Sequence, residues 1–214
     1  AVTNDLSPLR LGRMLLACTN GTVVTGSALT FTNLSLPSTL TVTAGTHAFE
    51  APAVLGHNGL LVDTYTPAAI TLSGALSGSG SLIANSAAAG GGRVTLSGAS
   101  TFTGPTALGC GTLAFGALSD GGAPGPLGAS SAASSNLLLG AGTLHYTGPS
   151  ATTDRGFTLQ AGSGRAALLR TDNDLTFAGP VAAASGAFIK DGDGTLALTF
   201  PGTHTLSAYE HTDI

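Results

Sequence analysis

Short stretches in which every second residue is apolar recur along the chain, and threonine or serine fills most of the positions between. Glycine-rich turns separate one stretch from the next. This period of two predicts β-strands that bury one face and expose the other. We expect strands at ten places: Ala28–Thr32, Leu40–Thr43, Ala69–Ser73, Arg93–Ser97, Gly111–Phe115, Asn136–Leu139, Gly142–Tyr146, Phe157–Gln160, Leu175–Phe177 and Gly194–Leu198.

The same turn chemistry closes several strands, which indicates a structural repeat. We expect the turn glycines to adopt positive φ at corners of the fold, because glycine does so without steric cost. The corners are Ser73-Gly74, Ser97-Gly98, Phe115-Gly116, Thr147-Gly148 and Ala178-Gly179. A longer unit also recurs, since Ile70–Ile83 resembles Leu175–Ile189 at an offset of 105 residues. Units of about 20 residues per coil predict an all-β fold, a right-handed parallel β-helix or β-solenoid.

A β-sandwich is the rival architecture. Its hairpins favour Asn-Gly or Asp-Gly turns. Such pairs are scarce here, the Asp-Gly examples being Asp120-Gly121, Asp191-Gly192 and Asp193-Gly194. The solenoid is therefore preferred.

The chain divides into an N-terminal cap or first strand over residues 1–25 and a solenoid over residues 26–214. A short cap helix over residues 7–20 is one interpretation, with Ser7 as the N-cap and Pro8 at the first helical position. A first strand is the other. Residues 84–93 and 117–135 are expected to be loops protruding from coil corners, with an interdomain linker as the alternative. Leu206–Ile214 shows no cap pattern.

Composition narrows the function classes. Only 8% of the 214 residues are charged, against about 25% in an ordinary domain. The mean hydropathy of +0.36 excludes a disordered chain. The net charge of −4 offers no basic patch for nucleic acid or anionic lipid. No apolar run approaches the ~18 residues of a membrane-spanning helix.

Several segments together resemble the passenger-associated transport repeats, also called autotransporter-associated β-strand repeats. The matching segments are Gly78–Ile83, Arg93–Gly104, Gly109–Gly116, Pro149–Leu159, Ser185–Lys190 and Asp191–Leu198. The resemblance covers about residues 60–206 and leaves residues 1–25 outside it. It implies a right-handed parallel β-helix on an exported bacterial surface protein, and it implies no catalytic residues and no cofactor.

Candidate sites are few. Asp172, Asp174, Asp191 and Asp193 form the acidic clusters, and closely spaced carboxylates can hold Ca²⁺, although Asx residues also stabilise plain turns. Cys18 and Cys110 are either a disulfide or two buried thiols. The five histidines show no metal spacing, and the three tyrosines are dispersed. A glycosidase needs two carboxylates placed across a groove, and we find no such repeated acids.

The sequence therefore predicts a non-catalytic structural protein, located outside the cell or on a bacterial surface. The low charge favours self-association, because it removes the repulsion that keeps proteins apart. We expect a subunit of a self-assembling fibre, in which terminal coils pair head to tail. The alternative is the passenger or stalk of an autotransporter-like adhesin that binds glycan or host protein. A polysaccharide-cleaving β-helix enzyme is a remote third interpretation.

Overall fold

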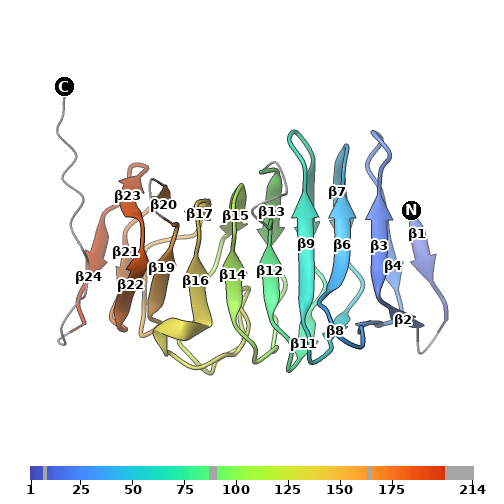
Figure 1. Cartoon of the computed structure of the whole chain (residues 1–214), viewed down its shortest axis with the longest axis horizontal. Coiled ribbons are helices and arrows are strands. Elements are labelled where there is room, and N and C mark those ends of the chain that lie inside the picture. The colour runs from blue at the N-terminus through green and yellow to red at the C-terminus, as the bar shows by residue number, and fades with distance from the viewer. Residues whose placement is uncertain (7–8, 87–90, 163–164, 201–214) are drawn as a thin grey trace.

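The chain winds into a parallel β-solenoid of about eight turns, whose coils are stacked along the long axis of the molecule (Figure 1). This computed structural model describes residues 1–6, 9–86, 91–162 and 165–200. All strand pairs in the four sheets are parallel. The all-β solenoid predicted from the sequence is confirmed. The Leu206–Ile214 segment lies outside the described residues.

Each coil visits three faces in turn. Face 1 is a nine-stranded sheet. Its strands are β1 (Val2–Asn4), β4 (Val23–Gly26), β7 (Thr46–Phe49), β10 (Ala69–Leu72), β13 (Arg93–Leu96), β15 (Thr112–Phe115), β17 (Thr143–Tyr146), β20 (Ala166–Thr171) and β23 (Ala187–Asp191). We number the coils by their face-1 strands, so that β1 opens coil 1 and β23 opens coil 9.

Face 3 is an eight-stranded sheet. It contains β3 (Arg13–Leu16), β6 (Ser38–Val42), β9 (Leu60–Thr64), β12 (Leu82–Ala84), β14 (Thr106–Leu108), β16 (Leu137–Leu139), β19 (Phe157–Gln160) and β22 (Val181–Ser185). Face 2 is divided into two sheets. The first contains β2 (Leu9–Leu11), β5 (Leu29–Phe31), β8 (Ala53–Leu55) and β11 (Leu76–Gly78), and the second contains β18 (Ala151–Thr153), β21 (Leu175–Phe177) and β24 (Leu196–Leu198).

The core fills the space enclosed by the three faces. Alternate residues of most strands point inward and are buried, as in the pattern of β5, β6 and β9. Aromatic side chains from successive coils meet there, for example Phe115 with Tyr146, whose ring centroids are 5.4 Å apart, and Phe157 with Phe177, at 5.1 Å. Such pairs add dispersion contacts to the hydrophobic burial that holds the coils together.

The ten strands predicted from the sequence are all present, and they belong to all three faces. The prediction of a cap helix over residues 7–20 is wrong, because β2 and β3 occupy residues 9–11 and 13–16. The chain there pairs with β5 and β6, so it already forms the first coil. Ser7 and Pro8 lie outside the described residues. In the described part of the chain, the one helical element is the short 3-10 turn η1 (Ser134–Asn136).

The turn glycines lie at corners, as predicted, but positive φ is not the reason. Gly74 and Gly98 are absent from the positive-φ glycines of the described residues. Instead, neighbouring coils approach closely: a Cβ on Gly74 would collide with the carbonyl of Ala51, and a Cβ on Gly98 would lie 2.6 Å from the carbonyl oxygen of Gly74. The corner therefore requires glycine because the backbones of successive coils stack there.

The long sequence repeat is real as a pattern but is not one structural unit. Ile70 opens a run through faces 1, 2 and 3 on β10, β11 and β12, whereas Leu175 opens a run through faces 2, 3 and 1 on β21, β22 and β23. The same strand-and-glycine pattern fits any of the three faces, because each face of a coil consists of one short strand followed by one tight corner.

Candidate functional site

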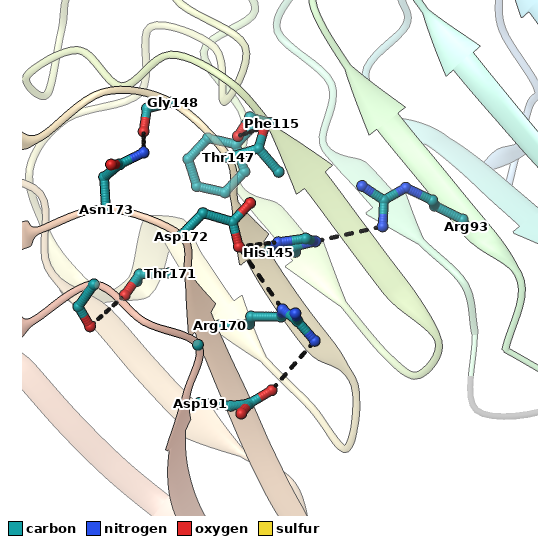
Figure 2. A network of polar contacts seen from close by, with 12 residues as sticks. Arg93, Phe115, His145, Thr147, Gly148, Arg170, Thr171, Asp172, Asn173 and Asp191 are labelled. Carbon is teal, nitrogen blue, oxygen red and sulfur yellow. Dashed lines mark hydrogen bonds and ion pairs between the residues drawn. The ribbon is translucent and has the colours of Figure 1, made fainter.

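A network of charged side chains lies on the outward surface of face 1 near coils 5 to 9 (Figure 2). His145 on β17, Arg170 on β20 and Asp191 on β23 are register partners, so their side chains emerge in one row. Arg170 Nη1 lies 3.5 Å from Asp191 Oδ2, and Arg170 Nε lies 3.8 Å from Asp172 Oδ1. The row therefore joins three successive coils.

His145 is the centre of this network (Figure 2). Its Nε2 lies 2.9 Å from Asp172 Oδ1, and its Nδ1 lies 3.4 Å from Arg93 Nη1. A guanidinium can only donate, so Nδ1 accepts and the proton of a neutral imidazole is assigned to Nε2, which donates to Asp172. The imidazole thereby links an arginine of coil 5 to a carboxylate of coil 8.

Ala114 explains how Arg93 reaches across a whole coil. It lies on β15, between β13 and β17, in register with His145. It faces outward between the core residues Leu113 and Phe115, yet only 1% of its surface is exposed. Its small side chain leaves room for Arg93 to pass over it. The hydrogen bond from His145 lowers the pKa of the exposed Asp172 carboxyl; desolvation opposes this, and the charges of Arg170 and Arg93 add to the lowering.

The candidate calcium ligands occupy two turns that follow neighbouring face-1 strands, β20 and β23. Asp172 and Asp191 are in the network described above, while Asp174 Oδ1 accepts a hydrogen bond from the backbone N–H of Thr195 at 2.8 Å. That bond lowers the pKa of Asp174, and Asp193 is exposed. Among the residues that the structure describes, no group of three His, Cys, Asp or Glu side chains could hold a metal. Calcium binding at these turns stays a prediction.

The two cysteines lie at corners between face 3 and face 1, following β3 and β14. Four inter-strand steps of the face-3 ladder separate these strands, or about 19 Å at the usual strand spacing, which is too far for a disulfide. Cys18 is exposed, and the half-buried Cys110 thiol donates to the carbonyl of Ser86 at 2.9 Å. Desolvation, followed by the charge of Asp63, raises the pKa of Cys110.

The second polar site was missed from the sequence. It surrounds Arg155, which is only 3% exposed and lies between β18 and β19. Its guanidinium donates to backbone carbonyls of residues 117–135, a segment that we call the insert. The closest contacts are Gly128 O at 2.6 Å from Nη2 and Ser119 O at 2.9 Å from Nε. Burial lowers the pKa of Arg155, and the charges of Asp154 and Asp120 oppose this.

The insert replaces the face-2 strand of coil 6. It was predicted to protrude, but Gly125 to Gly128 are buried and Leu127 belongs to the hydrophobic core. It also bonds to both neighbouring coils: Ala129 N donates to Phe102 O at 2.8 Å, and Gly121 N donates to Asp154 Oδ1 at 2.7 Å. Arg155 lay within the segment Pro149–Leu159 that resembled the repeat family, and its position just before a corner glycine was the only available signal.

Neither site has the arrangement of an enzyme centre. The face-1 network joins its basic and acidic groups to one another, and the guanidinium of Arg155 is committed to backbone carbonyls. Such groups hold coils and loops in place. In the described part of the chain, no helix is long and apolar enough to cross a bilayer.

Comparison with known proteins gives one informative likeness. Over 53 residues, which are 25% of this chain, the sequence is 49% identical to the "Adhesin BmaC autotransporter" of Brucella suis biovar 1 (strain 1330). The matched part spans 2% of that much longer protein. No protein-family model matches the chain, and no solved structure matches it significantly. The likeness and the solenoid together indicate an autotransporter passenger-like β-helix.

Proposed function

We propose that this chain is a non-catalytic β-solenoid segment in the exported passenger of an autotransporter-like bacterial surface adhesin. The 49% identity to an adhesin autotransporter, found in a chain that folds as a β-solenoid, is the observation that carries the proposal. The same likeness favours a location on the cell surface or outside the cell.

The structure supports a role as a rigid, elongated element. Faces 1 and 3 carry continuous parallel ladders from coil to coil, and the face-1 network adds side-chain links between coils 5, 7, 8 and 9. A stack of this kind resists bending because two of its three faces are joined from coil to coil by unbroken backbone ladders. It can hold a binding surface at a distance from the cell.

The self-assembling fibre expected from the sequence stays a prediction. It depends on the terminal coils, and residues 201–214 are not described. The likeness to an adhesin autotransporter favours the passenger over the fibre. A polysaccharide-cleaving enzyme has no support in the contacts described above.

Surface display tests the proposal. The chain is fused between an epitope tag and an autotransporter translocator in a bacterial host, with the translocator and tag alone as the control. We expect the tag to reach the cell surface, where external protease removes it, and the displaying cells to adhere to glycan-coated or host-cell-coated surfaces more than control cells do. Surface display without any gain in adhesion would overturn the adhesin role. Release of reducing sugar from a polysaccharide panel would overturn the non-catalytic role.

A further inference from the structure

A hollow of about 600 Å³ lies at the corner between face 3 and face 1, where coils 5, 6 and 7 pass. Its floor consists of two tight corners, Gly109-Cys110-Gly111 and Gly140-Ala141-Gly142. Each of these two corners has three residues between its strands. Gly91 and Arg165, from the neighbouring corners, also line the hollow.

The glycines of this floor are structurally required. A Cβ on Gly140 would lie 2.6 Å from the carbonyl oxygen of Gly109, and one on Gly111 would lie 2.6 Å from that of Gly92. The floor therefore presents glycine backbone beside the side chains of Cys110 and Ala141, and a ligand can approach the glycines closely. A second hollow of about 250 Å³ continues on the face-3 side and shares Ala141 and Arg165 with the first.

The polar side chains that line the hollow carry two hydroxyls, a cation and the Cys110 thiol, which donates to Ser86 O. Thr112 and Thr143 are register partners on the adjacent strands β15 and β17, so their outward side chains stand side by side, about 4.8 Å apart at the usual strand spacing. Arg165 is exposed and lines both hollows. Within the described ranges, its side chain has no ion pair and no hydrogen bond.

A second arginine lies close by. Arg93 is the register partner of Thr112, and its hydrogen bond goes to the neutral Nδ1 of His145. Among the described residues it forms no ion pair with a carboxylate. Arg93 does not line the hollow, so Arg165 is the cation that stands beside the two threonine hydroxyls, in a protein whose net charge is −4. This combination suits a ligand that carries both a carboxylate and hydroxyl groups.

We propose that this hollow binds a carboxylated sugar, a uronate or a sialate of a host or environmental glycan. Arg165 pairs with the carboxylate by charge-assisted hydrogen bonds, and Thr112 and Thr143 bond to ring hydroxyls. The volume falls within the usual range of ligand sites. The inference rests on the proposed adhesin function, for which it names a ligand class and a place on the solenoid.

Calorimetric titration with matched sugars tests the site. The probes are a galacturonate oligomer against its carboxyl-reduced neutral counterpart, and sialyllactose against lactose. We expect at least one acidic probe to bind more tightly than its neutral partner, with an affinity that falls as salt rises. Arg165→Gln is expected to weaken that binding about tenfold, and the double variant Thr112→Val/Thr143→Val is expected to weaken it as well.

The control is Arg13→Gln, which removes an equally exposed arginine from face 3 of coil 1 and should leave binding unchanged. Circular dichroism confirms that each variant stays folded. Equal affinity for acidic and neutral probes, no binding of either acidic probe, or unchanged binding by Arg165→Gln would overturn the proposal. So would equally tight binding of poly-glutamate, since charge alone would then explain the effect. Sugar binding without adhesion of displaying cells would remove the adhesin role and keep the site, and the reverse result would remove the site alone.

Discussion

Faces 1 and 3 and the interrupted face 2 show two ways of stacking the same coils. On faces 1 and 3 every coil from β13 to β20 joins the next by a backbone ladder, and the side chains outside add only minor links. On face 2 no described residues form a strand between β11 and β18: coil 5 bonds to β11 through Thr101 and Thr103, and the insert occupies coil 6. The buried Arg155 and a few backbone bonds, such as the Ser100–Gly125 pair, hold the insert in place of a strand.

The difference shows what a solenoid needs when a strand is lost. Backbone groups that leave a ladder still require partners once they are buried. Several of the insert's carbonyls find theirs in the guanidinium of Arg155, which offers five N–H donors in a fixed plane. Face 2 thus concentrates many of its bonds on one side chain, whereas faces 1 and 3 distribute theirs over many residues.

The sharpest test of this comparison removes Arg155. Replacement by methionine keeps the length of the side chain but leaves the buried carbonyl of Gly128 without its guanidinium donor. We expect a loss of about 4 kcal/mol in the free energy of unfolding, measured by urea denaturation. The matched control is Arg170→Met in the face-1 network, which is exposed and should cost about 0.5 kcal/mol. Equal losses for the two variants would contradict the comparison.

The second test concerns the apolar anchor of the insert. Leu127→Ala removes a side chain that is 3% exposed and belongs to the core, and we expect a loss of about 3 kcal/mol. Its control is Leu138→Ala on face 3, where the side chain points outward and is partly exposed, so the loss should stay near 0.5 kcal/mol. Thermal melts compare the two. If Leu127→Ala loses no more stability than its control, the insert is not anchored in the hydrophobic core.

The smallest expected effect belongs to the face-1 network and depends on pH. The hydrogen bond from His145 lowers the pKa of Asp172 below its value in the unfolded chain, about 3.9. The bond therefore contributes stability above that pH, and the contribution is lost as the pH falls through the folded-state pKa. Asp172→Asn should lose less stability than the wild type between about pH 5 and pH 2.5. Parallel pH curves would show that the network does not stabilise the fold.

The strands could be predicted because their cause is local. A run such as Arg93–Leu96 alternates in burial as it does in hydropathy, whichever face it joins. For the N-terminal segment that contains β2, the sequence left a helix and a first strand open, because pairing with the next coil decides its conformation. The role of the corner glycines was misassigned for the same reason, since the carbonyl that excludes a side chain at Gly74 belongs to Ala51, one coil earlier.

The candidate sites depend on tertiary contacts more than the strands do. His145 and Arg93 are 52 residues apart in sequence and meet because coil 6 carries the small Ala114 between them. Almost nothing in the sequence indicated that Arg155 is buried and bonded. Its partners are backbone carbonyls, which are present at every residue and leave no pattern in a sequence. The four aspartates were singled out as a cluster, and in the structure Asp172 and Asp174 bond to different partners.

By itself the sequence determined that this protein is a β-solenoid built from short strands and glycine corners, because alternation and tight turns are properties of a few neighbouring residues. It also determined that charge is scarce. Only the tertiary structure decided which face each strand joins, where the ladder of face 2 breaks, and which side chains from distant coils come together. Those outcomes depend on the number of residues in each coil: the insertion of residues 117–135 breaks the ladder of face 2 while the ladders of faces 1 and 3 continue past it.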